Sequence, residues 1–375
     1  MSEILKVFTG ADVHDGYRLH KGAVLALLRD GSRQVLSLQE MPEGCEKVAL
    51  SGGVVTPGFV DLQVNGGGGV MFNDAPDVAT LRRMSEAHRA TGVAGFLPTL
   101  ITDTPECTAA AVDAVVHARA ENVPGILGVH LEGPHLSVAR KGAHDAALIR
   151  PMDDADLALI LGTARQLPNV MVTVAPETVT CDQISAMAGA GVIVSLGHSD
   201  ADYETCIAAF DAGARCVTHL FNAMSQMGNR APGLVGAALA RADMHAGLIA
   251  DGIHVHPASM GNALAAKGAG VFLVSDAMAT AGSEIESFAL NGRTVFRAEG
   301  RLTLSDGTLA GADLEMGRAV QVLMQSVGVP LERALAMATS GPVAVLRKAE
   351  GLGKIETSDM LLHCDPESGA VQVLS

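Results

Sequence analysis

Short apolar segments alternate with helix-like segments through the middle of the chain. Helix-like segments include residues 77–91, 105–121, 153–167, 201–212 and 257–267, and glycines follow several of them, as is common where helices end. This alternation predicts a parallel (β/α)8 barrel of the TIM type, because a doubly wound sheet rarely has eight strands. The eight apolar, often β-branched segments are residues 58–64, 93–99, 126–131, 170–175, 192–196, 216–219, 246–250 and 272–275.

Both ends of the chain have a different pattern. Apolar residues 24–28 and 35–38 flank Asp30-Gly31, which is typical of a hairpin, and residues 360–362 and 371–374 are similar short runs. We therefore expect residues 1–55 plus 350–375 to form a small β domain beside a barrel of residues 56–349. Two further features are expected after the eighth strand, an inserted hairpin at 288–304 and closing helices at 313–327 and 331–347.

Composition narrows the class of protein. The 375 residues include 26 Lys plus Arg and 41 Asp plus Glu, a net charge of −15, which argues against a nucleic-acid partner. Hydrophobic residues make up 48% and charged residues 18%, so a globular chain is expected. No apolar run reaches the roughly 18 residues of a membrane span, and no signal peptide is evident. Six scattered cysteines without a CxxC motif favour reduced thiols in the cytoplasm.

Polar residues gather where the expected strands end. The active site of such a barrel forms at the carboxyl ends of its strands. A single buried histidine is usually only hydrogen-bonded, but polar ends on six strands of one face favour a functional site. These residues are Asp61, Gln63 and Asn65 on the first strand, His130 and Glu132 on the third, His198 on the fifth, His219 and Asn222 on the sixth, Asp251 and His254 on the seventh, and Asp276 on the eighth.

One carboxylate and two imidazoles, from Glu132, His198 and His219, predict a catalytic metal site. A divalent ion there would lower the pKa of a bound water and polarise a carbonyl. Zinc suits nitrogen and oxygen ligands, and iron or manganese would also fit. Asp276 could accept a proton from the attacking water and donate it to a leaving amine. The alternative for Asp276 is a helix N-cap, and His130 is expected to hydrogen-bond behind the ligands.

These residues carry a resemblance to a known family. The segment PGFVDLQVNG at 57–66 resembles the first strand of the amidohydrolase superfamily. The match extends across the barrel, the terminal strands resemble a small β-sandwich of that family, and the order of the motifs is specific. The motifs similar to the N-acetylglucosamine-6-phosphate deacetylase family are HLEGP at 130–134, KGAH at 141–144, GHS at 197–199, THLFNAM at 218–224 and SDA at 275–277.

The first strand departs from the wider superfamily. Many members have His-x-His where this chain has Gln63 and Asn65, and those histidines hold a second metal. Amides are weak, neutral ligands, so we expect one tightly held divalent metal per subunit. Gln63 and Asn65 are candidates for contacting water or filling the region of the second metal.

The resemblance implies hydrolysis of N-acetylglucosamine 6-phosphate to glucosamine 6-phosphate and acetate, as part of amino-sugar catabolism. It assigns the metal to Glu132, His198 and His219, and the general acid/base role to Asp276. It also implies that His144 polarises the acetamide carbonyl, where charge develops.

The resemblance also implies which residues bind the phosphate group. Asn222, the backbone of Ala223, and His254 would contact it, together with Arg230 from the neighbouring subunit of a homodimer. The planar fork of arginine suits phosphate, although a solvated loop charge is the alternative for Arg230. These groups and the metal would offset the negative charge of the chain locally.

Two other functions stay open. A related amidohydrolase could act on a different amide, such as N-acetylgalactosamine 6-phosphate or an N-acyl amino acid. A non-catalytic barrel would be expected to have lost metal ligands or Asp276, and this chain has all four residues.

Overall fold

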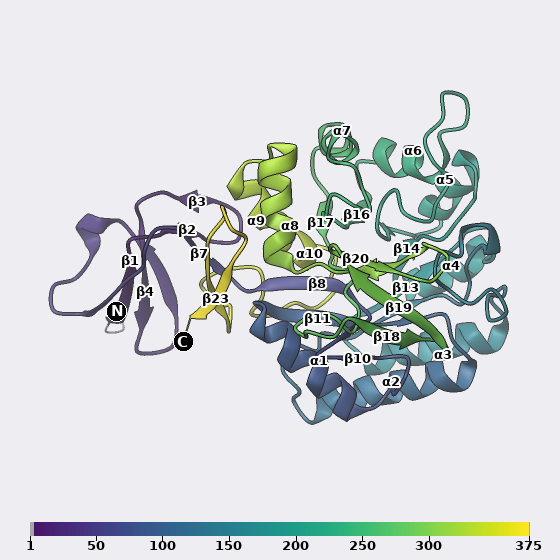
Figure 1. Cartoon of the computed structure of the whole chain (residues 1–375), viewed down its shortest axis with the longest axis horizontal. Coiled ribbons are helices and arrows are strands. Elements are labelled where there is room, and N and C mark those ends of the chain that lie inside the picture. The colour runs from purple at the N-terminus through teal and green to yellow at the C-terminus, as the bar shows by residue number, and fades with distance from the viewer. Residues whose placement is uncertain (1–3, 375) are drawn as a thin grey trace.

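A computed structural model describes residues 4–374, so residues 1–3 and 375 of the predicted terminal domain lie outside it. Eight parallel strands form the central sheet, and neighbours in the sheet follow one another along the chain (Figure 1). A parallel bridge between Val64 and Ala277 joins the two edges into a nearly closed barrel, which confirms the predicted (β/α)8 architecture. The strands are β8 (Phe59–Val64), β11 (Val93–Ile101), β12 (Val129–Glu132), β13 (Val170–Val174), β14 (Ile193–Leu196), β15 (Cys216–Val217), β16 (His245–Leu248) and β17 (Val271–Leu273).

Burial on both faces explains the apolar strands. Every residue of β8, β11, β12, β13 and β14 is buried, as in sheets covered by helices. Side chains of Asp77, Thr104, Asp153, Thr180 and Asp202 cap five of the covering helices, each accepting a backbone N–H. The helices of the ring are α1 (Val78–Ala90), α2 (Pro105–Ala120), α3 (Asp154–Gln166), α4 (Cys181–Gly189), α5 (Tyr203–Asp211), α6 (Gly233–Ala240) and α7 (Pro257–Lys267).

Helices close the barrel after its last strand, as predicted. They are α8 (Met316–Val322), which continues into the π-helical turn Leu323–Val327, then α9 (Leu331–Ala338) and α10 (Ser340–Val343). Among the helices of residues 4–374, none has the length and apolar content needed to cross a bilayer.

Two sheets built from both chain ends lie beside the barrel (Figure 1). An apolar cluster that includes Phe8, Leu25, Val55 and Leu361 draws on both sheets, and the predicted hairpin is the antiparallel pair β4–β5. The first sheet has the order β5 (Arg33–Leu36), β4 (Val24–Leu28), β1 (Ile4–Thr9), β6 (Glu46–Ala49). The second has the order β23 (Val371–Leu374), β22 (Leu361–Cys364), β7 (Val54–Pro57), β2 (Asp12–His14), β3 (Leu19–His20).

The insertion after the eighth strand is larger than the predicted hairpin at 288–304. It is a four-stranded antiparallel sheet of β18 (Ser287–Leu290), β19 (Arg293–Ala298), β20 (Arg301–Thr303) and β21 (Leu309–Ala312). The prediction missed β21 because its sequence, LAGA, lacks the β-branched residues typical of strands. The backbone N–H of Ala312 donates to the carbonyl of Asp276, so the insertion is anchored beside the barrel's last strand.

Candidate metal centre and active site

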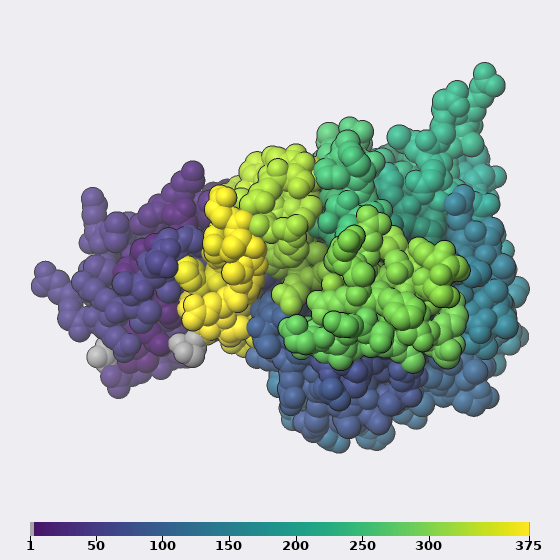
Figure 2. All heavy atoms as spheres, viewed as in Figure 1, coloured from purple at the N-terminus to yellow at the C-terminus, as the bar shows by residue number. Residues whose placement is uncertain are grey.

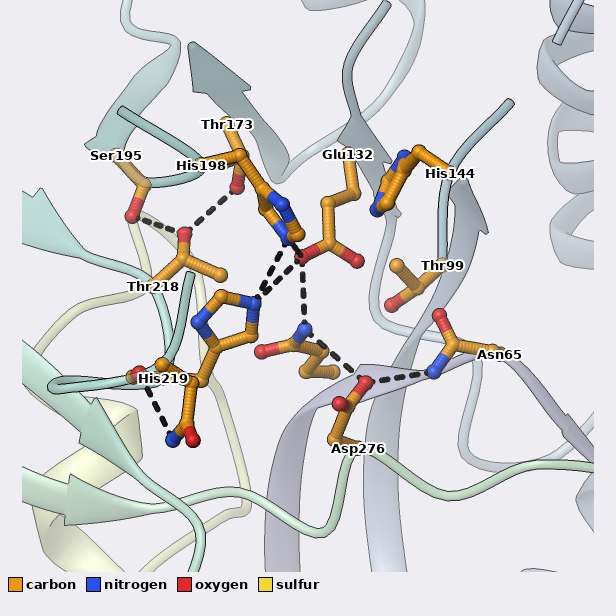
Figure 3. Close-up of polar contacts among 12 residues, drawn as sticks. Asn65, Thr99, Glu132, His144, Thr173, Ser195, His198, Thr218, His219 and Asp276 are labelled. Carbon is orange, nitrogen blue, oxygen red and sulfur yellow. Dashed lines mark hydrogen bonds and ion pairs between the residues drawn. The ribbon is translucent and has the colours of Figure 1, made fainter. Parts of the chain in front are cut away.

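Three side chains converge at the carboxyl ends of neighbouring barrel strands. Glu132 ends β12, His198 follows β14 and His219 follows β15. Glu132 Oε1 lies 3.3 Å from Nε2 of His198 and 3.1 Å from Nε2 of His219, and the two Nε2 atoms are 3.0 Å apart (Figure 3). All three residues are buried, and their ligand atoms form a group that could hold one metal ion.

Unusual backbone angles turn these side chains inward. His198, His219 and Asp276 have φ values of 47°, 31° and 52°, in the left-handed region that non-glycine residues rarely adopt. Such angles cost about 1–3 kcal/mol each and persist where the surrounding structure imposes them. The chain therefore turns sharply just past three strand ends, which brings an imidazole or a carboxylate over the barrel mouth.

The protonation pattern of the cluster fits a divalent cation. His198 Nδ1 donates to the carbonyl oxygen of Arg140 at 2.9 Å, so its Nε2 lone pair faces Glu132 and His219. His219 Nδ1 is buried and has no hydrogen-bond partner among residues 4–374. Although burial opposes it, the two neighbouring imidazoles hold the pKa of Glu132 well below its usual range. An ionised carboxylate beside imidazole nitrogens is a donor set that zinc, iron or manganese accepts.

Gln63 and Asn65 face the same cluster through amide nitrogens rather than oxygens. Gln63 Nε2 donates to Glu132 Oε1 and to Asp276 Oδ1, both at 3.1 Å, and Asn65 Nδ2 donates to Asp276 Oδ1 at 2.7 Å. N–H groups cannot ligate a cation, so these amides orient carboxylates in this arrangement. Asn65 Oδ1 is buried and none of the residues that the structure describes donates a hydrogen bond to it, which leaves one acceptor for a water.

Asp276 is a buried carboxyl group held by one oxygen. Burial and the charge of Glu132 raise the pKa of Asp276 to about 6, against the opposing effect of the Asn65 hydrogen bond. No helix begins after it; Ala277 instead makes strand-like bridges to Val64 and Ala312. The helix N-cap alternative is therefore wrong, and a carboxylate of raised basicity faces the pocket.

His144 reaches the pocket as a neutral ring. Burial and the neighbouring His198 lower its pKa to about 3. The backbone N–H of Thr102 donates to His144 Nδ1 at 3.3 Å, so Nδ1 is an acceptor and the proton resides on Nε2. His144 thus offers an N–H donor to a molecule in the pocket.

Most of the predicted site residues line one pocket of about 540 Å³. The metal cluster, Asp276, His144 and Asn65 line it, with Asn222, Ala223 and His254. Asp251 Oδ2 lies 2.6 Å from Nδ1 of His254 and orients that ring. Gln63 lies directly behind this lining, through its contacts to Glu132 and Asp276.

Arg230 lies apart from this pocket. It is exposed, in a loop between β15 and α6 that projects from the molecule, and it is absent from the pocket lining (Figure 1, Figure 2).

His130 points into the barrel, where it contacts the carbonyl of Leu62 at 3.0 Å and Thr173 Oγ1 at 2.7 Å.

Two polar lining residues were missed by the sequence analysis. Arg140 lies directly before the KGAH motif, and Thr308 lies between β20 and β21 of the inserted sheet. The position of Arg140 beside that motif was a usable signal. No sequence signal marked Thr308, because this residue reaches the pocket only when the inserted sheet folds over the barrel.

Comparisons with known proteins show the family of the chain. The model of the Amidohydrolase family matches residues 54–358. An N-acetylgalactosamine-6-phosphate deacetylase of Shewanella is 44% identical over 82% of this chain and 77% of its own. An N-acetylglucosamine-6-phosphate deacetylase of Haemophilus influenzae is 36% identical, with 86% and 84% covered.

A solved structure agrees over nearly the whole chain. The crystal structure of N-acetylglucosamine-6-phosphate deacetylase from Pasteurella multocida superposes with a TM-score of 0.91 at 35% identity, covering 98% of this chain and 96% of that one. The resemblance inferred from the sequence motifs is confirmed. The chain belongs to the amidohydrolase family.

Proposed function

We propose that this enzyme hydrolyses the acetamide of N-acetylglucosamine 6-phosphate, giving glucosamine 6-phosphate and acetate, in amino-sugar catabolism. One observation carries the proposal: the carboxylate of Asp276, the N–H of His144 and the Glu132–His198–His219 cluster line a single pocket. These groups can serve as the base, the electrophilic donor and the metal site of a metal-dependent amide hydrolysis.

Each residue has a distinct role in the proposed reaction. A divalent cation bound by Glu132, His198 and His219 would supply Lewis acidity to the site. Asp276 accepts a proton from the attacking water on its free oxygen, Oδ2, and then donates that proton to the departing sugar amine. His144 donates its Nε2–H to the acetamide oxygen as negative charge develops there. The neutral ring of His144 keeps its Nε2 proton and polarises the carbonyl through a hydrogen bond.

We propose zinc as the resident metal, with iron or manganese as alternatives, and one tightly bound ion per subunit. The set of one carboxylate and two imidazoles supports this choice. The amide N–H groups of Gln63 and Asn65, which point at carboxylates, support a single ion.

The phosphate contacts are proposed from the family motifs and the pocket lining. Asn222, the backbone of Ala223, and His254 line the pocket and would bind the phosphate. Arg230 would come from the neighbouring subunit of a homodimer, and its exposed loop outside its own pocket supports that arrangement.

A cytoplasmic location is proposed on the state of the cysteines. All six are free, and Cys206, Cys216 and Cys364 are buried as thiols. Neither nucleic acid nor a membrane is proposed as a partner. The net charge of −15 argues against binding to nucleic acid.

A second candidate substrate is N-acetylgalactosamine 6-phosphate. The Shewanella relative at 44% identity acts on that epimer by name, and it is more similar to this chain than the Haemophilus relative. The two sugars are epimers that differ at one hydroxyl.

Acetate release tests the proposal directly. Purified, metal-loaded protein would be assayed on both phosphorylated epimers and on unphosphorylated N-acetylglucosamine. We expect the highest kcat/KM on N-acetylglucosamine 6-phosphate. A higher value on the galacto epimer would establish the second candidate, and release from neither phosphorylated sugar would refute both.

A further inference from the structure

We propose that Glu177 is a positioning residue for the metal ligand His198. Glu177 lies just past β13, whereas His198 follows the adjacent strand β14. The inference rests on the metal-dependent function proposed above, and it concerns a residue outside both the metal cluster and the pocket lining.

The carboxylate of Glu177 holds the two residues that follow His198. Its Oε2 accepts a hydrogen bond from Ser199 Oγ at 2.7 Å, and its Oε1 accepts from the backbone N–H of Asp200 at 2.7 Å. Ser199 is fully buried, so its hydroxyl needs this acceptor. Both carboxylate oxygens are therefore bonded to one short turn.

That turn needs external support. His198 adopts φ 47°, a conformation that costs a non-glycine residue free energy unless its neighbours impose it. The backbone N–H of Ser137 donates to the carbonyl of His198 at 2.8 Å, which fixes the turn on one side. Glu177 fixes it on the other side, through the next two residues.

A second set of contacts links Glu177 to the orientation of the His198 ring. The carboxylate of Asp200, whose backbone Glu177 holds, accepts from Arg140 Nε at 2.7 Å. The carbonyl of Arg140 in turn accepts from His198 Nδ1 at 2.9 Å, and that bond directs Nε2 at the metal position. Hydrogen bonds thus connect Glu177 through Asp200 and Arg140 to the ring of His198.

A general surface role does not account for these contacts. Among residues 4–374, no Lys or Arg forms an ion pair with Glu177. Its two oxygens instead accept from a hydroxyl and a peptide N–H of the ligand-bearing turn. Partners that orient a ligand in this way commonly contribute about 10- to 100-fold to metal affinity.

Cobalt binding to the full-length protein tests the inference. Co²⁺ would be titrated into metal-free wild type, Glu177→Ala and the control Glu86→Ala, which changes an exposed glutamate of α1. We expect Glu177→Ala to bind Co²⁺ about 10- to 100-fold more weakly, with an altered visible absorption spectrum. Wild-type affinity and an unchanged spectrum in Glu177→Ala would overturn the inference.

Conservative variants keep the test decisive if Glu177→Ala folds poorly. Glu177→Gln retains an oxygen for the Asp200 N–H but loses the second acceptor, and Ser199→Ala removes only the hydroxyl. We expect each variant to lose part of the Co²⁺ affinity. In the double variant Glu177→Gln/Ser199→Ala, the loss of binding free energy should be smaller than the sum of the two single losses. Additive losses, or none, would contradict the proposed coupling.

The same titration separates the inference from the proposed function. Wild type that binds Co²⁺ but deacetylates neither sugar would refute the proposed substrates, and the comparison with Glu177→Ala would still decide the positioning role. Wild type that does not bind Co²⁺ would overturn both.

Discussion

The side-chain amide of Asn65 donates to Oδ1 of Asp276 at 2.7 Å, between the first and last strands of the barrel. This bond favours the ionised carboxylate, while burial and the charge of Glu132 favour the protonated form and raise the pKa of Asp276 to about 6. The balance leaves a carboxylate that is ionised at neutral pH yet basic enough to take a proton from water.

Activity is expected to fall at acid pH for this reason. Asp276 must be ionised to act as the base, so kcat/KM should decrease about tenfold per pH unit once the pH is below about 6. A pH profile of kcat/KM for acetate release measures this limb. A limb near pH 4, the ordinary range of aspartate, would contradict the assignment.

Asn65→Asp should move that limb to higher pH. The substitution replaces a donor by a second carboxylate at hydrogen-bond distance, and like charges raise each other's pKa by about one unit or more. Asn73→Asp is a matched control, because Asn73 donates to Asp103 at 2.9 Å and is absent from the pocket lining. An equal shift in both variants would show that the effect is not local to Asp276.

Asp276→Asn should abolish proton transfer without removing the metal. The amide cannot accept the proton, so kcat should fall by about 10²- to 10⁴-fold. Metal content by elemental analysis should be unchanged, because the proposed ligand group, Glu132, His198 and His219, does not include Asp276. A rate near that of wild type would remove Asp276 from the mechanism.

His144→Ala should lower kcat more than it changes KM. Loss of one donor to a developing oxyanion costs about 10²- to 10³-fold in kcat. His144→Gln restores an N–H donor and should recover part of the rate. Steady-state kinetics of the two variants test this, and equal rates for both would argue against a donor role.

Arg230→Ala should weaken binding of phosphorylated substrates selectively. An arginine–phosphate pair is charge-assisted, so KM for the sugar phosphate should rise by about tenfold or more. Activity on the unphosphorylated sugar should change little. Arg165→Ala, an exposed arginine of α3, serves as the control, and equal effects of Arg230→Ala on both sugars would refute the phosphate role.

Sequence patterns located the barrel well because its strands obey one physical rule. Helices cover the barrel and side chains fill it, so each strand reads as a short apolar run, and segments such as 93–99 and 170–175 coincide with β11 and β13. The pattern failed for β21, because its sequence, LAGA, lacks the β-branched residues typical of strands. The motifs likewise located Glu132, His198, His219 and Asp276, because strand ends in this fold meet on one face.

The amino-acid sequence by itself determined the barrel, its family, the ligand types and the net charge of −15. Only the tertiary structure decided which nitrogen of His144 carries the proton, how Asn65 and Glu132 set the basicity of Asp276, and that Glu177 holds the turn after His198. The reason is physical. Residue type and periodicity are local properties of the chain, whereas hydrogen-bond direction, desolvation and backbone strain depend on atoms brought together from separate strands.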